Sequence, residues 1–174
     1  VGMTSIPRVS LGYFTRAVVA EPAQADFRCL VQNVVVNRLR GRVLPDNCAI
    51  YSHTGVVRFR EQEQSGVHRV SGKEKDGEVP SFTLDDWLDQ RGIRPRHVHF
   101  VKSDAQGSGG HVFAGAEELL RLRRAIWQIE YWRGGSTRSI RQRPSCRISC
   151  ASGSRTSCCW AAGETGTKTR SRAR

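Results

Sequence analysis

The sequence predicts an α/β protein whose sheet is largely parallel and covered by helices. Apolar runs of strand length alternate with helical periodicities through residues 1–132, and this alternation is typical of βαβ units. The 174 residues, 38% of them hydrophobic and 25% charged, are enough for one domain with its own core. The pattern stops after Trp132, so residues 133–174, rich in Arg, Ser, Thr and Gly, are predicted to be a disordered tail.

Periodicity and turn residues place the elements in order. Apolar side chains recur at helical spacing between Gln24 and Leu39, with Pro22 before that segment and Gly41 after it. Thr83 is typical of an N-cap residue. The predicted elements are a strand at Arg16–Glu21, a helix at Gln24–Leu39, strands at Val43–Tyr51 and Val56–Phe59, a loop over residues 61–78, an extended segment at Val79–Phe82, a helix that buries Leu84, Trp87 and Leu88, a strand from Val98, a helix at Gly110–Arg124 and a final apolar run at Ala125–Trp132.

The net charge of +12 belongs mainly to the tail. Residues 133–174 hold ten Lys and Arg against one acid, whereas residues 1–132 hold 18 against 15. A basic folded domain is therefore not predicted, and non-specific nucleic-acid binding through the tail remains an alternative that would be strongly salt-dependent.

Cysteine usage and hydropathy limit the other classes of protein. Cys29 and Cys48 are predicted to be buried free thiols. The remaining cysteines have no metal-ligand spacing and no nearby histidine, so no metal is predicted: Cys146, Cys150, Cys158 and Cys159. No signal-peptide pattern and no run of about 18 apolar residues occurs, which predicts a cytoplasmic protein without a membrane span.

Polar residues at predicted strand ends are the candidate site. Ligands of open α/β sheets bind outside the carboxyl ends of the strands. Asp104 and Gln106 follow one strand and Glu21 ends another, and Asp46 or Asn47 is expected to share their crevice. The alternative is structural, with Asp104 and Glu21 capping the helices that follow them.

The order of several segments resembles the FkbM-type family of S-adenosylmethionine-dependent methyltransferases. TSIPRVSLGYFTRAVVAEPAQADFRCLVQNVVVNRL is similar to the family's first helix, acid-ended second strand and next helix, and DNCAIYSHTGVVRF to its third strand and hairpin. VPSFTLDDWL is similar to the family's VP–TLDD segment, SDAQGSGGHVFAGAEELL to its D-x-Q-G-x-E-x-x-V-L-x-G-A signature, and IEYW to its closing strand.

This resemblance implies a Rossmann-like methyltransferase sheet that lacks its first strand, with residues 1–132 as a partial methyltransferase domain. It implies S-adenosylmethionine as the cofactor and O-methylation of a hydroxyl on a small molecule or glycan. Glu21 would bind the cofactor ribose, and Gly2 would be at most the last glycine of the Gly-rich loop that precedes the first helix. Asn47 and Ala49 would lie near the adenine, and Asp104 and Gln106 at the methyl-transfer end of the cleft.

Three departures from the family imply impaired activity or a non-catalytic remnant of the fold. Gly109 stands where the family signature has its glutamate. The glycine-rich loop is cut off at Gly2, which indicates a fragment. Nothing after Trp132 resembles the family, and a shifted reading frame is our hypothesis for residues 133–174.

Overall fold

The computed structural model describes residues 2–60, 69–70, 77–105, 108–130, 149–150 and 157–160. The elements in chain order are α1 (Ser5–Ser10), β1 (Ala17–Ala20), α2 (Gln24–Val36), β2 (Val43–Asp46), β3 (Ala49–Ile50), β4 (Gly55–Arg60), β5 (Arg69–Val70), β6 (Gly77–Phe82), α3 (Leu84–Gln90), a 3₁₀ turn (Pro95–His97), β7 (Phe100–Ser103), α4 (Gly109–Ala114), α5 (Glu117–Leu122), β8 (Ile126–Glu130), β9 (Ser149–Cys150) and β10 (Ser157–Trp160).

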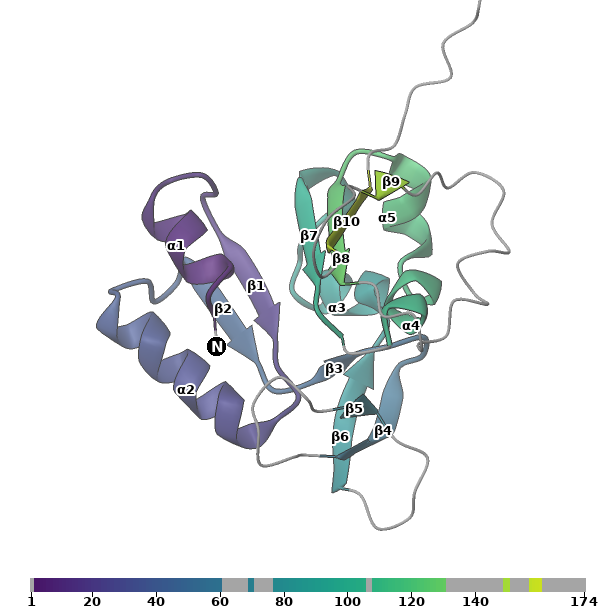
Figure 1. The fold of residues 1–174 in the computed structure, drawn as a ribbon, viewed down its shortest axis with the longest axis horizontal. Coiled ribbons are helices and arrows are strands. Elements are labelled where there is room, and N and C mark those ends of the chain that lie inside the picture. The colour runs from purple at the N-terminus through teal and green to yellow at the C-terminus, as the bar shows by residue number, and fades with distance from the viewer. Residues whose placement is uncertain are drawn as a thin grey trace, which may run out of the picture.

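The parallel part of the sheet consists of two separate strand pairs, β1 with β2 and β7 with β8. Figure 1 shows α1 and α2 beside the first pair and α3, α4 and α5 beside the second. Strands β1 and β7 do not pair with each other among the described residues. Parallel strand pairs with helices beside them confirm the predicted α/β class.

A second sheet lies below the two pairs in Figure 1 and has the order β3-β6-β4-β5. Strand β3 pairs parallel with β6, and β4 pairs antiparallel with β6 and β5. The strand predicted over Val43–Tyr51 is thus two strands that join different sheets. Strand β2 ends at Asp46 and β3 begins at Ala49, so the chain passes from one sheet to the other through Asn47 and Cys48.

Two apolar clusters form the core. One packs α1 and α2 on β1 and β2 around Val9, Leu30 and Val43. The other packs α3, α4 and α5 on β7 and β8 around Trp87, Leu119 and Trp127, and partly buried side chains of β1 also contact it. The predicted buried stripe of Leu84, Trp87 and Leu88 is confirmed.

The helix predicted over Gly110–Arg124 is two helices, because Gly115 lies against another segment. A Cβ at Gly115 would overlap the Tyr51 carbonyl oxygen and would lie 3.1 Å from the Thr83 Cα. The backbone therefore turns at Gly115 and Ala116 before α5 begins. The earlier helix also ends sooner than predicted, at Val36, and Arg38 then adopts a left-handed conformation with φ of 57°.

One further prediction needs correction. Cys29 is exposed because it lies on the outer face of α2, whereas Cys48 is buried as predicted and its pKa rises to about 11 through desolvation. Two short segments of the tail are described: β10 pairs antiparallel with β8, and β9 pairs antiparallel with β10. This pairing covers a strand edge whose backbone groups would otherwise lack partners. The rest of residues 133–174 lies outside the described residues.

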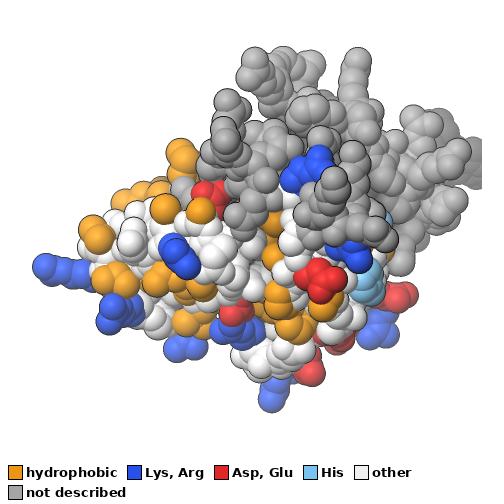
Figure 2. Space-filling view, turned by 90° about the horizontal axis from the view of Figure 1, so that it is seen from below, with side chains coloured by type: hydrophobic (Ala, Val, Ile, Leu, Met, Phe, Trp, Pro, Cys, Tyr) orange, Lys and Arg blue, Asp and Glu red, His pale blue; other side chains and the backbone are white. Residues whose placement is uncertain are grey.

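The face of the molecule drawn in Figure 2 carries both basic and acidic side chains. Lys and Arg side chains stand apart from one another there, and acidic side chains lie between them. On this face the basic side chains do not form one continuous patch. None of the helices described is long and apolar enough to cross a membrane.

Candidate functional site

Glu21 lies directly after β1, at the carboxyl end of the β1–β2 pair. Its backbone N–H donates to the carbonyl of Asp46, 2.9 Å away, which extends the parallel pairing by one residue. Its Oε1 accepts the N–H of Ala23 at 3.0 Å, and Ala23 is the N-cap residue of α2. The half-buried carboxylate is therefore held at the sheet edge, and the alternative capping role predicted for it is also present.

Asn47 joins the ends of the two strands. Its Nδ2 donates to the carbonyls of Glu21 and Pro22 at 2.9 and 3.1 Å. The predicted proximity of Glu21 and Asn47 is thus seen in the structure. Both amide hydrogens of Asn47 are used on the backbone, which gives this side chain the role of positioning the turn that carries Glu21.

Asp46 faces away from that turn and anchors α3. Its Oδ2 accepts the indole N–H of Trp87 at 2.8 Å, and its other oxygen forms an ion pair with Arg91. Buried indole N–H groups require such a partner. Of the two residues considered from the sequence, Asn47 lies with Glu21, and Asp46 has a structural role.

Gly2 and Ala49 are both placed by packing. Gly2 has φ of 79°, which favours glycine, and a Cβ there would have to displace the ends of the Ile6 and Leu30 side chains, at 2.7 and 2.9 Å. Ala49 is a buried residue of β3 and pairs with Ser81 of β6. Their roles at the cofactor stay predictions.

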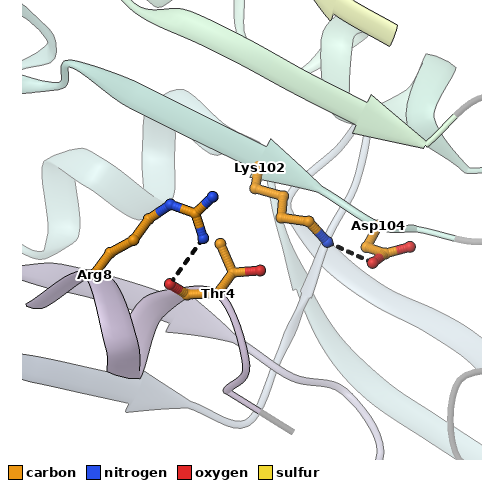
Figure 3. A network of polar contacts seen from close by, with 4 residues as sticks. All are labelled: Thr4, Arg8, Lys102 and Asp104. Atoms are coloured by element: carbon orange, nitrogen blue, oxygen red, sulfur yellow. Dashed lines mark hydrogen bonds and ion pairs between the residues drawn. The ribbon is translucent and has the colours of Figure 1, made fainter. Parts of the chain in front are cut away.

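Asp104 follows β7 and belongs to a charged group that reaches α1. Its Oδ2 lies 2.5 Å from the Lys102 ammonium. Figure 3 shows Arg8 and Thr4 of the α1 segment facing this pair, with Arg8 donating to the Thr4 carbonyl at 3.3 Å. No contact between Asp104 and Glu21 is seen within the described part of the chain, and Gln106 lies outside it.

Gly109 begins α4 beside the end of β8. A Cβ there would lie 3.3 Å from Cγ2 of Ile129, which is a tight contact with the end of a side chain. A longer residue at this position would therefore require Ile129 to shift by a few tenths of an ångström. Glycine is not required here by backbone strain, since no positive φ is found at Gly109.

The TLDD segment (Thr83–Asp86) connects three elements. Thr83 accepts the Asp86 N–H as the N-cap of α3. Asp85 accepts the N–H groups of Glu118 and Leu119 at 2.8 and 3.3 Å, in the first turn of α5. The Thr54 hydroxyl donates to Asp86, and hydrogen bonds from Thr54 and Thr83 lower the pKa of that carboxyl. These residues stabilise the fold around the site.

His111 forms an aromatic group with the segment after β3. Its ring stacks on Tyr51 with centroids 4.1 Å apart, and its Nδ1 lies 3.1 Å from the Ser52 hydroxyl. Burial is the main cause of its lowered pKa, and the neighbouring His53 adds to the effect. The imidazole is therefore neutral at physiological pH and packs α4 against the second sheet.

Comparisons with known proteins agree with this architecture. The model of one protein family, described as the methyltransferase FkbM domain, matches residues 11–142. The solved structure of methyltransferase FkbM from Methylobacillus flagellatus KT is similar to this chain with a TM-score of 0.61 and 15% sequence identity, a level that shows a shared fold. The match covers 91% of this chain and 40% of that protein, so the chain spans less than half its length. No curated protein matches the sequence.

Proposed function

Since the chain belongs to the family of methyltransferase FkbM domains, we propose that it binds S-adenosylmethionine and methylates a hydroxyl of a small molecule or glycan. The observation that carries this proposal is the position of Glu21. Its carboxylate is fixed at the carboxyl end of a parallel strand pair, where ligands of open α/β sheets bind.

The chemistry of Glu21 fits the ribose of the cofactor. A ribose presents two neighbouring hydroxyl donors, and a carboxylate offers two acceptor oxygens. Hydrogen bonds to a charged group contribute about 1.5–3 kcal/mol each. Asn47 supports this arrangement by holding the carbonyls of Glu21 and Pro22, so the acid loses little conformational entropy on binding.

S-Adenosylmethionine supplies an electrophilic methyl group, and the chain must orient the acceptor hydroxyl in line with it. The ammonium of Lys102 lies 2.5 Å from Asp104 and competes with a substrate proton for the carboxylate. We therefore assign Asp104 to orientation rather than to proton uptake. Gln106, predicted at the same end of the cleft, would donate to the acceptor oxygen.

Slow turnover is part of the proposal. The resembled family has a glutamate at the position of Gly109, and a general base contributes about 10²–10⁴-fold to rate. A Cβ at position 109 would lie 3.3 Å from Cγ2 of the buried Ile129, so a glutamate there requires Ile129 to shift by a few tenths of an ångström. The loss of this carboxylate, and not a collapsed site, is then the cause of low activity.

The test is transfer of a tritium-labelled methyl group from S-adenosylmethionine to a panel of sugars and small hydroxyl compounds. We expect slow transfer by the natural chain and a rise of about 10²–10⁴-fold in Gly109→Glu. Ala114→Glu, which adds the same side chain at an exposed position of α4, should match the natural chain. Equal rates in all three proteins would exclude a catalytic role for position 109, and no transfer with no cofactor binding would contradict the proposed function.

A further inference from the structure

The amino end of the β1–β2 pair carries a group of arginines. The strands are parallel, with Ala17 opposite Val43, so the connections that precede them, residues 11–16 and 37–42, lie at the same edge of the pair. In Figure 1 this edge is the end of the pair opposite the arrowheads. We call the two connections together the basic end, because they contain no acidic residue and four exposed arginines: Arg16, Arg38, Arg40 and Arg42.

Arg42 holds the two connections of the basic end together. Its Nε donates to the carbonyl of Thr15 at 3.3 Å, and its Nη2 donates to the carbonyl of Val9 at 2.7 Å. No ion pair of the other three arginines is found within the described residues. The fold therefore keeps like charges close together at this edge, and an anionic partner would relieve their repulsion.

Exposed apolar side chains lie at the same end. Leu11 and Tyr13 flank Gly12 in the first connection and are 73% and 74% exposed, and Val36, the last residue of α2, is 79% exposed just before the second. Single exposed apolar residues are common on protein surfaces. Three of them beside a group of arginines are typical of an interaction surface, and lipid interfaces take both kinds of side chain.

We propose that the basic end docks on the surface of an anionic lipid bilayer. Its arginines contact the negatively charged headgroups, and Leu11, Tyr13 and Val36 enter the boundary between headgroups and acyl chains. These apolar side chains favour a membrane over a nucleic acid, because the attraction of a nucleic acid for a basic surface comes from its phosphates and gives exposed aliphatic side chains no partner.

The direction of the strands keeps the candidate site away from the membrane. Glu21 follows β1 at its carboxyl end, and the basic end precedes β1 at its amino end. A strand of four residues spans about 13 Å. A docked molecule therefore holds its lipid contacts on one edge of the pair and Glu21 on the opposite edge. This inference is independent of the proposed function, because none of its residues belongs to the cofactor site.

The experiment is cosedimentation of the full chain with phosphatidylcholine vesicles that contain or lack phosphatidylserine. We expect binding only to the vesicles with phosphatidylserine. The triple variant Arg16→Gln, Arg38→Gln and Arg40→Gln should bind them about 100-fold more weakly, because each arginine near such a surface contributes about fivefold. Arg42 stays unchanged in this variant because it holds the two connections together.

A matched control removes the same charge from another part of the fold. The variant with glutamine at three exposed arginines before β8 should bind within about fivefold of the natural chain: Arg121→Gln, Arg123→Gln and Arg124→Gln. Residues 133–174 are present in every protein compared, so their charge contributes equally to each.

A second pair of variants tests the apolar contacts without changing the charge. The double variant Leu11→Ser and Tyr13→Ser should bind the vesicles with phosphatidylserine about tenfold more weakly, because its side chains no longer enter the interface. Val56→Ser changes a side chain of β4 that is 55% exposed and should bind as the natural chain does. Thermal melting of each variant confirms that the folded protein is the one being measured.

Four results would overturn the proposal. The first is that the natural chain does not bind the vesicles with phosphatidylserine. The second is an equal loss of binding in the two arginine variants, which would mean that net charge alone causes the attraction. The third is full binding by the double serine variant, which would exclude contact of the apolar side chains with lipid. The fourth is tighter binding to a DNA duplex that depends on the same three arginines, which would assign the basic end to a nucleic acid.

Discussion

Replacing Asp85 by alanine should destabilise the protein without changing its ligand affinity. The Asp85 carboxylate accepts two backbone N–H groups in the first turn of α5, and the N-cap residue of that helix, Ala116, makes no side-chain capping bond. Loss of a helix cap costs about 0.5–2 kcal/mol. Loss of a negative charge at a helix start costs about 0.3–1 kcal/mol more. We therefore expect the free energy of unfolding to fall by about 1–3 kcal/mol.

Urea denaturation followed by tryptophan fluorescence measures this change, because Trp87 and Trp127 are both buried. Asp89→Ala removes an acid from an exposed position of the same helix α3 and should change stability by less than about 0.5 kcal/mol. Equal stability of Asp85→Ala and Asp89→Ala would refute the capping argument. A loss of S-adenosylhomocysteine affinity in fully folded Asp85→Ala would show instead that the TLDD segment belongs to the binding site.

Three further changes test the packing. The pKa of His111 is lowered in the folded protein, so near pH 6 the unfolded chain binds more protons than the folded one, and the free energy of unfolding should rise with pH up to about 7. In His111→Phe, which keeps a ring against Tyr51, denaturation at several pH values should show a smaller rise of the free energy of unfolding with pH. Gly115→Ala should destabilise by about 1–3 kcal/mol, because the added Cβ meets the backbone of Tyr51; a melting temperature equal to that of the natural chain would contradict this contact. Leu30→Ala should cost about 2–5 kcal/mol in urea denaturation, because Leu30 of α2 is fully buried in the cluster that α2 forms with α1 and β2. A loss below about 1 kcal/mol would mean that this core is loosely packed.

Local patterns predicted much of the fold because they depend on neighbouring residues. The strand before Glu21, the helix from Gln24 and the Thr83 cap are all present near their predicted positions. The breaks at Gly115 and after Asp46 were not predictable in this way, since each depends on a distant segment. Gly115 turns because Tyr51 and Thr83 lie against it, and the chain changes sheets after Asp46 because β3 pairs with β6.

The candidate site shows the same limit. The position of a polar residue after a predicted strand located Glu21, and parallel pairing explains why Asn47 lies beside it. No sequence pattern indicated that Arg8 would face Lys102 and Asp104, because α1 and β7 are about 90 residues apart in the sequence. This arrangement of side chains was therefore visible only in the structure, while the position of Gln106 is still a prediction.

Calorimetric titration of S-adenosylhomocysteine into the natural chain and into Glu21→Ala tests the central claim most directly. If Glu21 binds the ribose, the variant should lose at least about tenfold in affinity, since hydrogen bonds to a charged group contribute about 1.5–3 kcal/mol each. Glu78→Ala, which removes an exposed acid from β6, should bind as the natural chain does. Equal affinity of Glu21→Ala and the natural chain would contradict the placement of the cofactor at the end of β1.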